Sequence, residues 1–265
     1  MKISNGKYIR KLLLSALILA LASPLSAQDP MADTETSTVT PEAQAVLDKM
    51  TAYIKTLDSF TIHSVSTRDE VVAFGYKLQH NESSTLTLQK PNLLRAEVDG
   101  DVRDRSIIYD GKNLLMYSPD KNVYTRVPAP DTIGKLIGGL INAGIELPSL
   151  DVLYQSYTGN IADNVRGGVL VGESKIDGVV CDHLAFRQAE VDWQIWVEKG
   201  AKPLLRKLVI TTRYEVGAPQ YQTVMHWTIN PKVDKPIFVF KAPKDATEIP
   251  FVNPASINVD TSSGE

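Results

Sequence analysis

The feature that most constrains this chain is a period-two alternation of apolar and polar residues, which runs with one interruption from residue 59 to residue 229. Successive side chains of a strand point to opposite faces, so alternate residues share a face. In residues 191–198, Val191, Trp193, Ile195 and Val197 share one face. Between residues 59 and 127 no helical pattern separates neighbouring runs, which argues against parallel βαβ units and predicts an antiparallel meander with one apolar face.

The predicted strands are bounded by turn residues, among them Asp110-Gly111 and Asp177-Gly178. Their ranges are 59–67, 69–76, 83–89, 93–99, 104–109, 113–118, 123–127, 169–176, 180–188, 191–198, 204–214 and 221–229. A porin-like membrane barrel is disfavoured, because charged residues such as Asp192 and Arg206 would fall on strands that must present an apolar band to lipid.

Two regions carry a helical period instead. Thr40 offers an N-cap, with Pro41 at the first helical position, to a helix over about residues 41–57. The second region is an insert over residues 131–157, where the spacing of apolar residues predicts two short helices separated at Pro148. Each interior glycine in the first of these costs about 0.5–1 kcal/mol relative to alanine, so this helix is expected to be marginal and mobile. Two roles stay open for it, a lid over the mouth of the sheet and a plain core-filling helix.

These segments together predict a mainly β (α+β) fold. We expect a strongly curved antiparallel sheet, or open half-barrel, of about 11–12 strands. The N-terminal helix and a central helical lid are expected to fill its concavity.

The ends of the chain differ from its middle. Residues 1–27 predict a cleavable signal peptide and hence a periplasmic protein, because four basic residues precede an apolar run too short to span a bilayer and a small-residue region follows. Polar, acidic composition predicts a disordered linker over residues 28–40 and a flexible C-terminal tail over residues 243–265. A single domain is expected to occupy residues 41–242.

Charge and motif content argue against several function classes. Removing residues 1–27 takes four positive charges from a chain of net charge −3 and leaves −7, which argues against nucleic-acid binding. No later run resembles a membrane span, so stable membrane insertion is not expected. Nucleophile elbow, zinc helix and phosphate loop are all missing, so we expect no enzyme, cofactor or metal site. Cys181 and His183 share a strand face, but two ligands do not make a metal site and a buried thiol is favoured.

The apolar strand face indicates a non-catalytic binding protein. We hypothesise that it holds a lipid, an acyl chain or an acylated protein as a hydrophobic ligand in the concavity. The residues predicted to form the cavity and its lid are Leu86, Leu88, Leu136, Ile137, Leu140, Trp193, Ile195, Met225 and Trp227. The alternative is a protein-interaction module, such as an envelope sensor or accessory subunit, that binds an envelope protein partner and fills its concave face with its own helices.

Several short motifs point to a known superfamily. Lys90-Pro91-Asn92 precedes a predicted strand, and an Asp110-Gly111 hairpin follows that ends in the turn Tyr117-Ser118-Pro119. In these motifs the chain resembles the periplasmic lipoprotein-carrier (LolA/LolB-like) superfamily. More narrowly, it is similar to an uncharacterised family of predicted periplasmic proteins in that superfamily, and the segments 177–184 and 203–208 support this narrower resemblance.

The resemblance implies a LolA-like open barrel over nearly the whole predicted domain. In carriers of this kind, an arginine before Pro-Asn is tied to ligand-linked opening and closing. Lys90 occupies that position and is the gating candidate. Lysine lacks the planar fork of arginine, so a carrier cycle identical to the family's is not implied.

Overall fold

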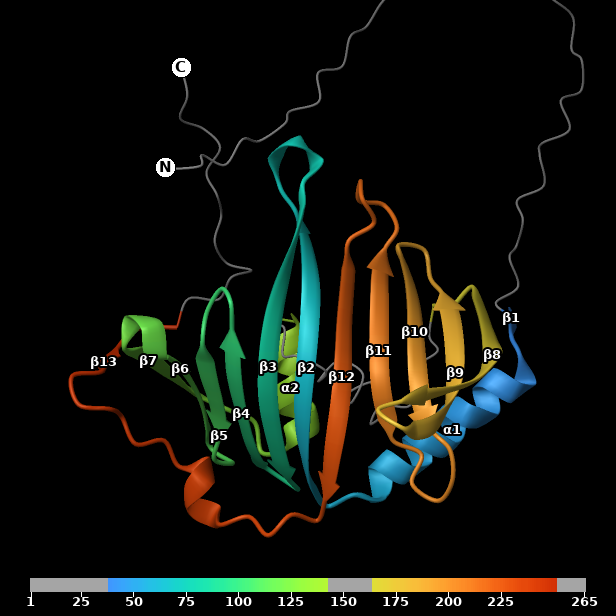
Figure 1. The fold of residues 1–265 in the computed structure, drawn as a ribbon. Helices are drawn as coiled ribbons and strands as arrows, with labels where there is room; N and C mark the ends of the chain where they lie inside the picture. Colours follow the sequence, from blue (N-terminus) through green and yellow to red (C-terminus); the bar gives the residue numbers. More distant parts are fainter. Residues whose placement is uncertain (1–37, 143–163, 252–265) are drawn as a thin grey trace, which may run out of the picture. The chain divides into compact units, whose positions relative to one another are not determined.

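The computed structural model describes residues 38–142 and 164–251, and Figure 1 shows the strands of this part joined in one sheet. The helices are α1 (Pro41–Thr56) and α2 (Ile133–Asn142), with short 3-10 turns η1 (Ala73–Gly75), η2 (Pro119–Lys121) and η3 (Lys235–Phe238). The strands are β1 (Thr38–Val39), β2 (Ser59–Val71), β3 (Lys77–Gln89), β4 (Leu93–Gly100), β5 (Arg105–Tyr109), β6 (Asn113–Ser118), β7 (Val123–Pro128), β8 (Gly167–Ile176), β9 (Val179–Arg187), β10 (Val191–Glu198), β11 (Leu205–Thr212), β12 (Gln220–Ile229) and β13 (Thr247–Glu248).

The sheet is built from two antiparallel meanders placed side by side. Strands β2 to β7 form one and β8 to β12 the other, and they meet where β12 pairs with β2. The two-residue strands β1 and β13 add parallel pairings to β8 and β7 at opposite edges. These edges do not pair with each other among the described residues, so the sheet is unclosed. It is also curved, and both features agree with the prediction.

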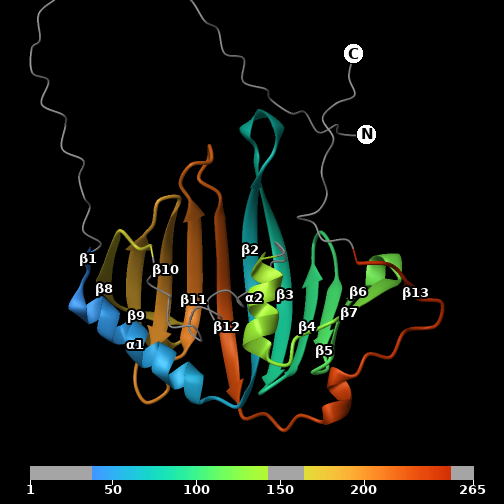
Figure 2. The same ribbon diagram turned by 180° about the vertical axis from the view of Figure 1, so that it is seen from behind.

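Both helices lie on one side of the sheet (Figure 2). Helix α1 crosses the part formed by β8 to β11, and α2 lies in front of β2 and β3. As predicted, Thr40 caps α1, because its hydroxyl accepts a hydrogen bond from the backbone N–H of Ala43 at 3.4 Å. One face of α1, which includes Leu47, Met50 and Ile54, is buried in an apolar cluster on the concave face.

The first predicted strand pair is wrong. Residues 59–67 and 69–76 were expected to form two strands, but β2 runs without a break from Ser59 to Val71, and its partner β3 begins at Lys77 rather than at residue 83. The turn lies between them, where Phe74 and Gly75 have φ angles of 65° and 77°. Polar residues occupy both faces near this turn, which hides the alternation by which strands are recognised.

The edges of the sheet lie outside the predicted domain of residues 41–242. Strand β1 falls in the expected linker and β13 in the expected C-terminal tail, so the structure moves both boundaries outward. The expected signal peptide and the helix predicted after Pro148 lie outside the described residues. No helix within residues 38–142 and 164–251 is long and apolar enough to cross a membrane.

Candidate ligand-binding site

The nine apolar residues predicted to bind ligand lie together in one hydrophobic cluster on the concave face. Eight of them are buried and Trp227 is half-buried. The indole N–H of Trp227 donates a hydrogen bond to the carbonyl oxygen of Leu205 at 2.8 Å, and its ring centroid lies 5.1 Å from that of Phe60. The structure therefore brings the predicted residues together as a filled core, in which the two helices occupy the concavity.

Helix α2 covers its part of this core with one face. Leu136, Ile137 and Leu140 are buried, whereas a side chain placed at Gly134 or Gly139 would meet no atom within 4 Å. The start of the helix is fixed, because the backbone N–H of its first residue, Ile133, donates to the carbonyl oxygen of Pro91 at 3.1 Å. Helix α2 is thus anchored at its N-terminal end and covers apolar residues that belong to β2 and β3.

Lys90, the gating candidate, lies at the C-terminal end of α1. Its Nζ donates a hydrogen bond to the carbonyl oxygen of Lys55 at 2.8 Å, and its backbone N–H donates to that of Asp58 at 2.8 Å. Burial lowers the pKa of Lys90, and the carboxylate of Asp58 opposes this shift. A cation is stabilised at a helix C-terminus by the helix dipole. Because Pro91 accepts a hydrogen bond from Ile133, the Lys90-Pro91 segment connects the end of α1 to the start of α2.

The concave face changes character along the strands. Paired residues of β12, β2 and β3 form rows across the sheet, and we list the rows in order towards the β2–β3 turn, which lies at the top of Figure 1. They are Ile229, Phe60 and Leu88; Trp227, Ile62 and Leu86; Met225, Ser64 and Ser84; Thr223, Ser66 and Glu82; and Tyr221, Arg68 and His80. We call the first two the lower rows and the last three the upper rows. The lower rows are apolar, whereas the upper rows carry mostly hydroxyl and charged side chains.

A cavity of about 480 Å³ lies over the upper rows. One side of it is apolar and is formed by Leu208 and Ile210 of β11. The other side carries Arg68 of β2, Glu82 of β3 and Arg105 of β5. A cavity with one apolar and one charged side is suited to an amphiphilic molecule, and its volume lies within the usual range for ligand pockets.

Several polar side-chain groups in the upper rows or on strand β5 have no partner within the described part of the chain. Nε of Arg105 and Oγ1 of Thr223 are buried without a hydrogen bond. The side chain of Arg68, which is exposed, makes no hydrogen bond or ion pair with any described residue. Arg105 has a distant carboxylate partner, with Nη2 3.5 Å from Oε2 of Glu82. Because a buried polar group without a hydrogen bond is costly, the Nε of Arg105, a residue that lines the cavity, marks a position where a ligand can supply the missing partner.

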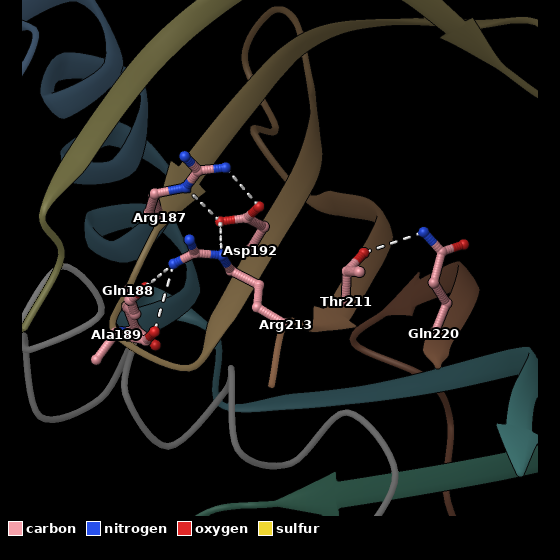
Figure 3. Close-up of polar contacts among 7 residues, drawn as sticks. All are labelled: Arg187, Gln188, Ala189, Asp192, Thr211, Arg213 and Gln220. Atoms are coloured by element: carbon pink, nitrogen blue, oxygen red, sulfur yellow. Dashed lines mark hydrogen bonds and ion pairs between the residues drawn. The ribbon is translucent and has the colours of Figure 1, made fainter. Parts of the chain in front are cut away.

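An ionic contact holds the rim of the sheet beside this cavity (Figure 3). Asp192 accepts two hydrogen bonds from Arg187, each of 2.8 Å, and lies 3.7 Å from Nε of Arg213. Arg213 also donates to the carbonyl oxygens of Gln188 and Ala189 at 3.1 and 3.3 Å. The hydrogen bond from Arg187 holds the pKa of Asp192 below its usual range. These contacts fix the β9–β10 turn against the end of β11.

The rim contacts continue towards the β2–β3 hairpin. Gln220 donates through Nε2 to the hydroxyl of Thr211 at 3.0 Å, as Figure 3 shows, and through its backbone N–H to Asp69 at 3.1 Å. Lys77 lies 3.1 Å from the Asp69 carboxylate. Burial raises the pKa of Asp69, but the hydrogen bonds from Lys77 and Gln220 outweigh it and leave that pKa below its ordinary value. The cavity edge is therefore tied together from β11 to β3.

Sequence reasoning missed the polar side of the cavity, although β2 contains a signal for it. The residues of β2 that face the helices are Phe60, Ile62, Ser64, Ser66 and Arg68 in succession. The alternation continues along the strand while the inward side chains change from apolar to hydroxyl to charged. An inward-facing arginine on a strand whose inward residues begin as apolar indicates a polar site at that end.

The thiol and imidazole considered from the sequence have ordinary partners. Cys181 is buried, which raises the pKa of its thiol. The ring of His183 stacks on Trp196 with 4.2 Å between centroids, and its Nε2 lies 3.0 Å from the side-chain oxygen of Gln194. No group of three or more metal-ligating side chains is found among residues 38–142 and 164–251.

A protein-family comparison gives a match over most of the chain. The family is described as "Predicted periplasmic protein (DUF2092)", and its model matches residues 43–252. No curated protein matches the chain.

Similar solved structures include LprF from Mycobacterium bovis, with 15% identity and a TM-score of 0.49 over 74% of this chain and 97% of that one. The lipoprotein LppX from Mycobacterium tuberculosis has 13% identity and a TM-score of 0.47 over 73% and 98% of the two chains. A LolA superfamily protein from Nitrosomonas europaea has 11% identity and a TM-score of 0.33 over 75% and 97%.

Proposed function

The chain belongs to the DUF2092 family of predicted periplasmic proteins, and from this premise we propose that it is a non-catalytic periplasmic binding protein for a lipid-like ligand. An acyl chain or a similar apolar group is held against the concave face of the sheet. The observation that carries the proposal is the cavity of about 480 Å³ that opens beside the apolar cluster on that face.

The apolar side of the cavity continues into the core. Leu208 and Ile210, which line the cavity, face Ile195 and Trp193 of β10 across the sheet. Two residues predicted to bind ligand therefore lie one strand away from the lining of the cavity. An acyl chain that enters the cavity meets a continuous apolar surface, and burial of such a chain is favourable by about 0.8 kcal/mol per methylene group.

A ligand that reaches farther down must take the place of α2. The helix buries Leu136, Ile137 and Leu140, and each such side chain contributes about 1.5–3 kcal/mol to stability when buried. An acyl chain can replace these contacts, and the interior glycines lower the intrinsic stability of the helix that has to move. In this account α2 acts as a cover that stays attached at Pro91 and yields at its other end.

A fluorescently labelled long-chain fatty acid tests the proposal in the mature protein. We expect saturable binding that Leu140→Glu weakens strongly, because a carboxylate then faces the apolar cluster. Gly139→Glu is the matched control, since it adds the same side chain at an adjacent exposed position. Thermal unfolding of both variants separates loss of binding from loss of folding. Normal binding by folded Leu140→Glu, or no binding by the unaltered protein, would contradict the proposal.

One observation favours a second function, a protein-interaction module with a self-filled core. Eight of the nine residues predicted to bind ligand are buried under the protein's own helices. In this alternative the concave face serves stability alone and an envelope protein binds elsewhere. Recovery of the protein with one stoichiometric protein partner and no lipid, together with failure to bind the labelled fatty acid, distinguishes this function from the first.

A further inference from the structure

We propose that the charged side of the cavity binds the acidic headgroup of an amphiphile, a carboxylate or a phosphate monoester, while its chain lies along Leu208 and Ile210. This inference rests on the proposed function and adds to it the class of headgroup and the orientation of the ligand. The apolar and charged sides belong to one cavity, which residues of β11 line on one side and residues of β2, β3 and β5 line on the other.

The first argument is the supply of free hydrogen-bond donors. The guanidinium group of Arg68 has no partner among the described residues, and the Nε of Arg105 is buried without one. A guanidinium group has five N–H donors and no acceptor, so only an acceptor can satisfy it. Carboxylate and phosphate oxygens form the strongest such bonds, often in a bidentate arrangement.

The second argument is that two of the four carboxylates that line the cavity, those of Asp69 and Asp101, are occupied within the protein. Asp69 accepts hydrogen bonds from the backbone of Gln220 and interacts with Lys77. Asp101 accepts from the backbone N–H of Asn81 at 2.6 Å and from its side-chain amide at 3.1 Å. These two acceptors are satisfied within the protein, whereas the arginine donors are not. At the arginines, the unmatched donors favour a ligand that brings acceptors.

Glu82 gives the inference a sharp consequence. Its carboxylate also lines the cavity, 3.5 Å from Nη2 of Arg105, and is the nearest competitor for that guanidinium. Removing its charge leaves the Arg105 donors to the ligand and removes a repulsion. Glu82→Gln should therefore strengthen the binding of an acidic amphiphile, an effect that a purely structural ion pair would not produce.

The third argument concerns the hydroxyl residues of β12 and β2 that lie in the same rows as Glu82 and Arg68. Thr223 is 0% exposed, yet its hydroxyl has no hydrogen-bond partner in the described residues. The hydroxyl of the neighbouring Ser66 lies 3.2 Å from that of Tyr221, which lines the cavity. Hydroxyl groups placed between the arginines and the apolar rows suit the junction of a headgroup with its chain, where polar and apolar parts of one molecule meet.

The test is calorimetric titration of the full mature protein with dodecanoate, dodecyl phosphate and dodecanol, each below its limit of aggregation. We expect one or both acids to bind at least about tenfold more tightly than dodecanol, as charged hydrogen bonds imply. Arg68→Gln and Arg105→Gln should each weaken the acids about tenfold and leave dodecanol unchanged. Glu82→Gln should strengthen the acids severalfold. Arg126→Gln, on the exposed side of β7 and outside the cavity lining, is the matched control and should change nothing.

The outcomes separate this inference from the proposed function. Preference for one acid over the other supports the inference and identifies the headgroup as carboxylate or phosphate. Equal binding of acids and dodecanol, with no effect of the cavity variants, overturns the headgroup site and leaves the proposed function standing. Failure of all three compounds to bind overturns both. Arg68 is exposed, so its variant tests the site even if Arg105→Gln does not fold.

Discussion

The lower and upper rows of the concave face belong to the same strands, but the lower rows form the core and the upper rows border the cavity. In the lower rows, Phe60, Ile62 and Leu88 are buried against the helices and stabilise the fold. In the upper rows, Arg68 and Glu82 line an open cavity, and some polar groups there have no partner among the described residues. The comparison shows that one strand can serve as core at one end and as binding surface at the other.

The largest effect on stability should come from truncating a buried side chain of the lower rows. Leu88 is 0% exposed, so Leu88→Ala should lower the free energy of unfolding by about 2–5 kcal/mol through lost burial and a new cavity. Ser84→Ala, on the same face of the same strand, is the control and should cost less than about 1 kcal/mol. Urea unfolding monitored by tryptophan fluorescence measures both. Equal costs would erase the distinction between the rows.

A smaller loss is expected at the junction of the helices. Lys90→Met removes the hydrogen bond to the carbonyl oxygen of Lys55 and should cost about 0.5–2 kcal/mol. The change keeps most of the apolar part of the side chain, so the loss reports the charged end. Lys175→Met, at an exposed position on β8, controls for removal of a positive charge. If both variants unfold at the same urea concentration, Lys90 does not hold the helix end.

Substitution of the buried Thr223 hydroxyl should have a small effect on stability, opposite in sign to the losses expected at Leu88 and Lys90. The buried hydroxyl of Thr223 has no hydrogen-bond partner among the described residues, and Thr223→Val puts a methyl group of similar shape in its place. We expect stability to stay the same or to rise by about 1 kcal/mol, because the cost of burying an unsatisfied group is relieved. A loss above about 1 kcal/mol in urea unfolding would show that this hydroxyl is satisfied and structural.

The smallest effect should be a pH dependence at the rim. The pKa of Asp192 is lowered in the folded protein, so its contribution is fully present above the unfolded-state pKa of about 3.9 and is lost as pH falls through the folded-state value. The contribution is at most about 1 kcal/mol, since the ion pair is partly exposed to water. Asp192→Asn should flatten the decline in unfolding free energy below about pH 4, and an unchanged pH profile would contradict this.

Much of the fold was predictable because strand alternation is a local property. The antiparallel curved sheet, the capped helix α1 and a helix within the insert predicted from residue 131, seen as α2, follow from such patterns, and the family match confirms the predicted periplasmic family. The error at residues 67–76 arose where polar residues occupy both faces of β2 and β3. Alternation cannot locate a turn once the two faces have the same polarity.

The site was predictable only in part. The alternation places Trp193, Ile195, Met225 and Trp227 on one face, but it does not reveal whether helices or open space lie over them. The cavity depends on Arg68 and Arg105, which are far apart in the sequence and enter it from β2 and β5. Only the strand order, in which β12 lies beside β2, brings the apolar side on β11 near these arginines.

The central claim is that the concave face holds a lipid-like ligand, and native mass spectrometry tests it most directly. The mature protein is purified from the periplasm without detergent, and anything that organic solvent releases from it is identified. We predict a complex heavier than the polypeptide alone and an amphiphile in the extract, both lost in Leu140→Glu and retained in Gly139→Glu. A folded protein found only at the mass of its polypeptide, which also takes up no lipid on incubation with envelope extract, would contradict the account.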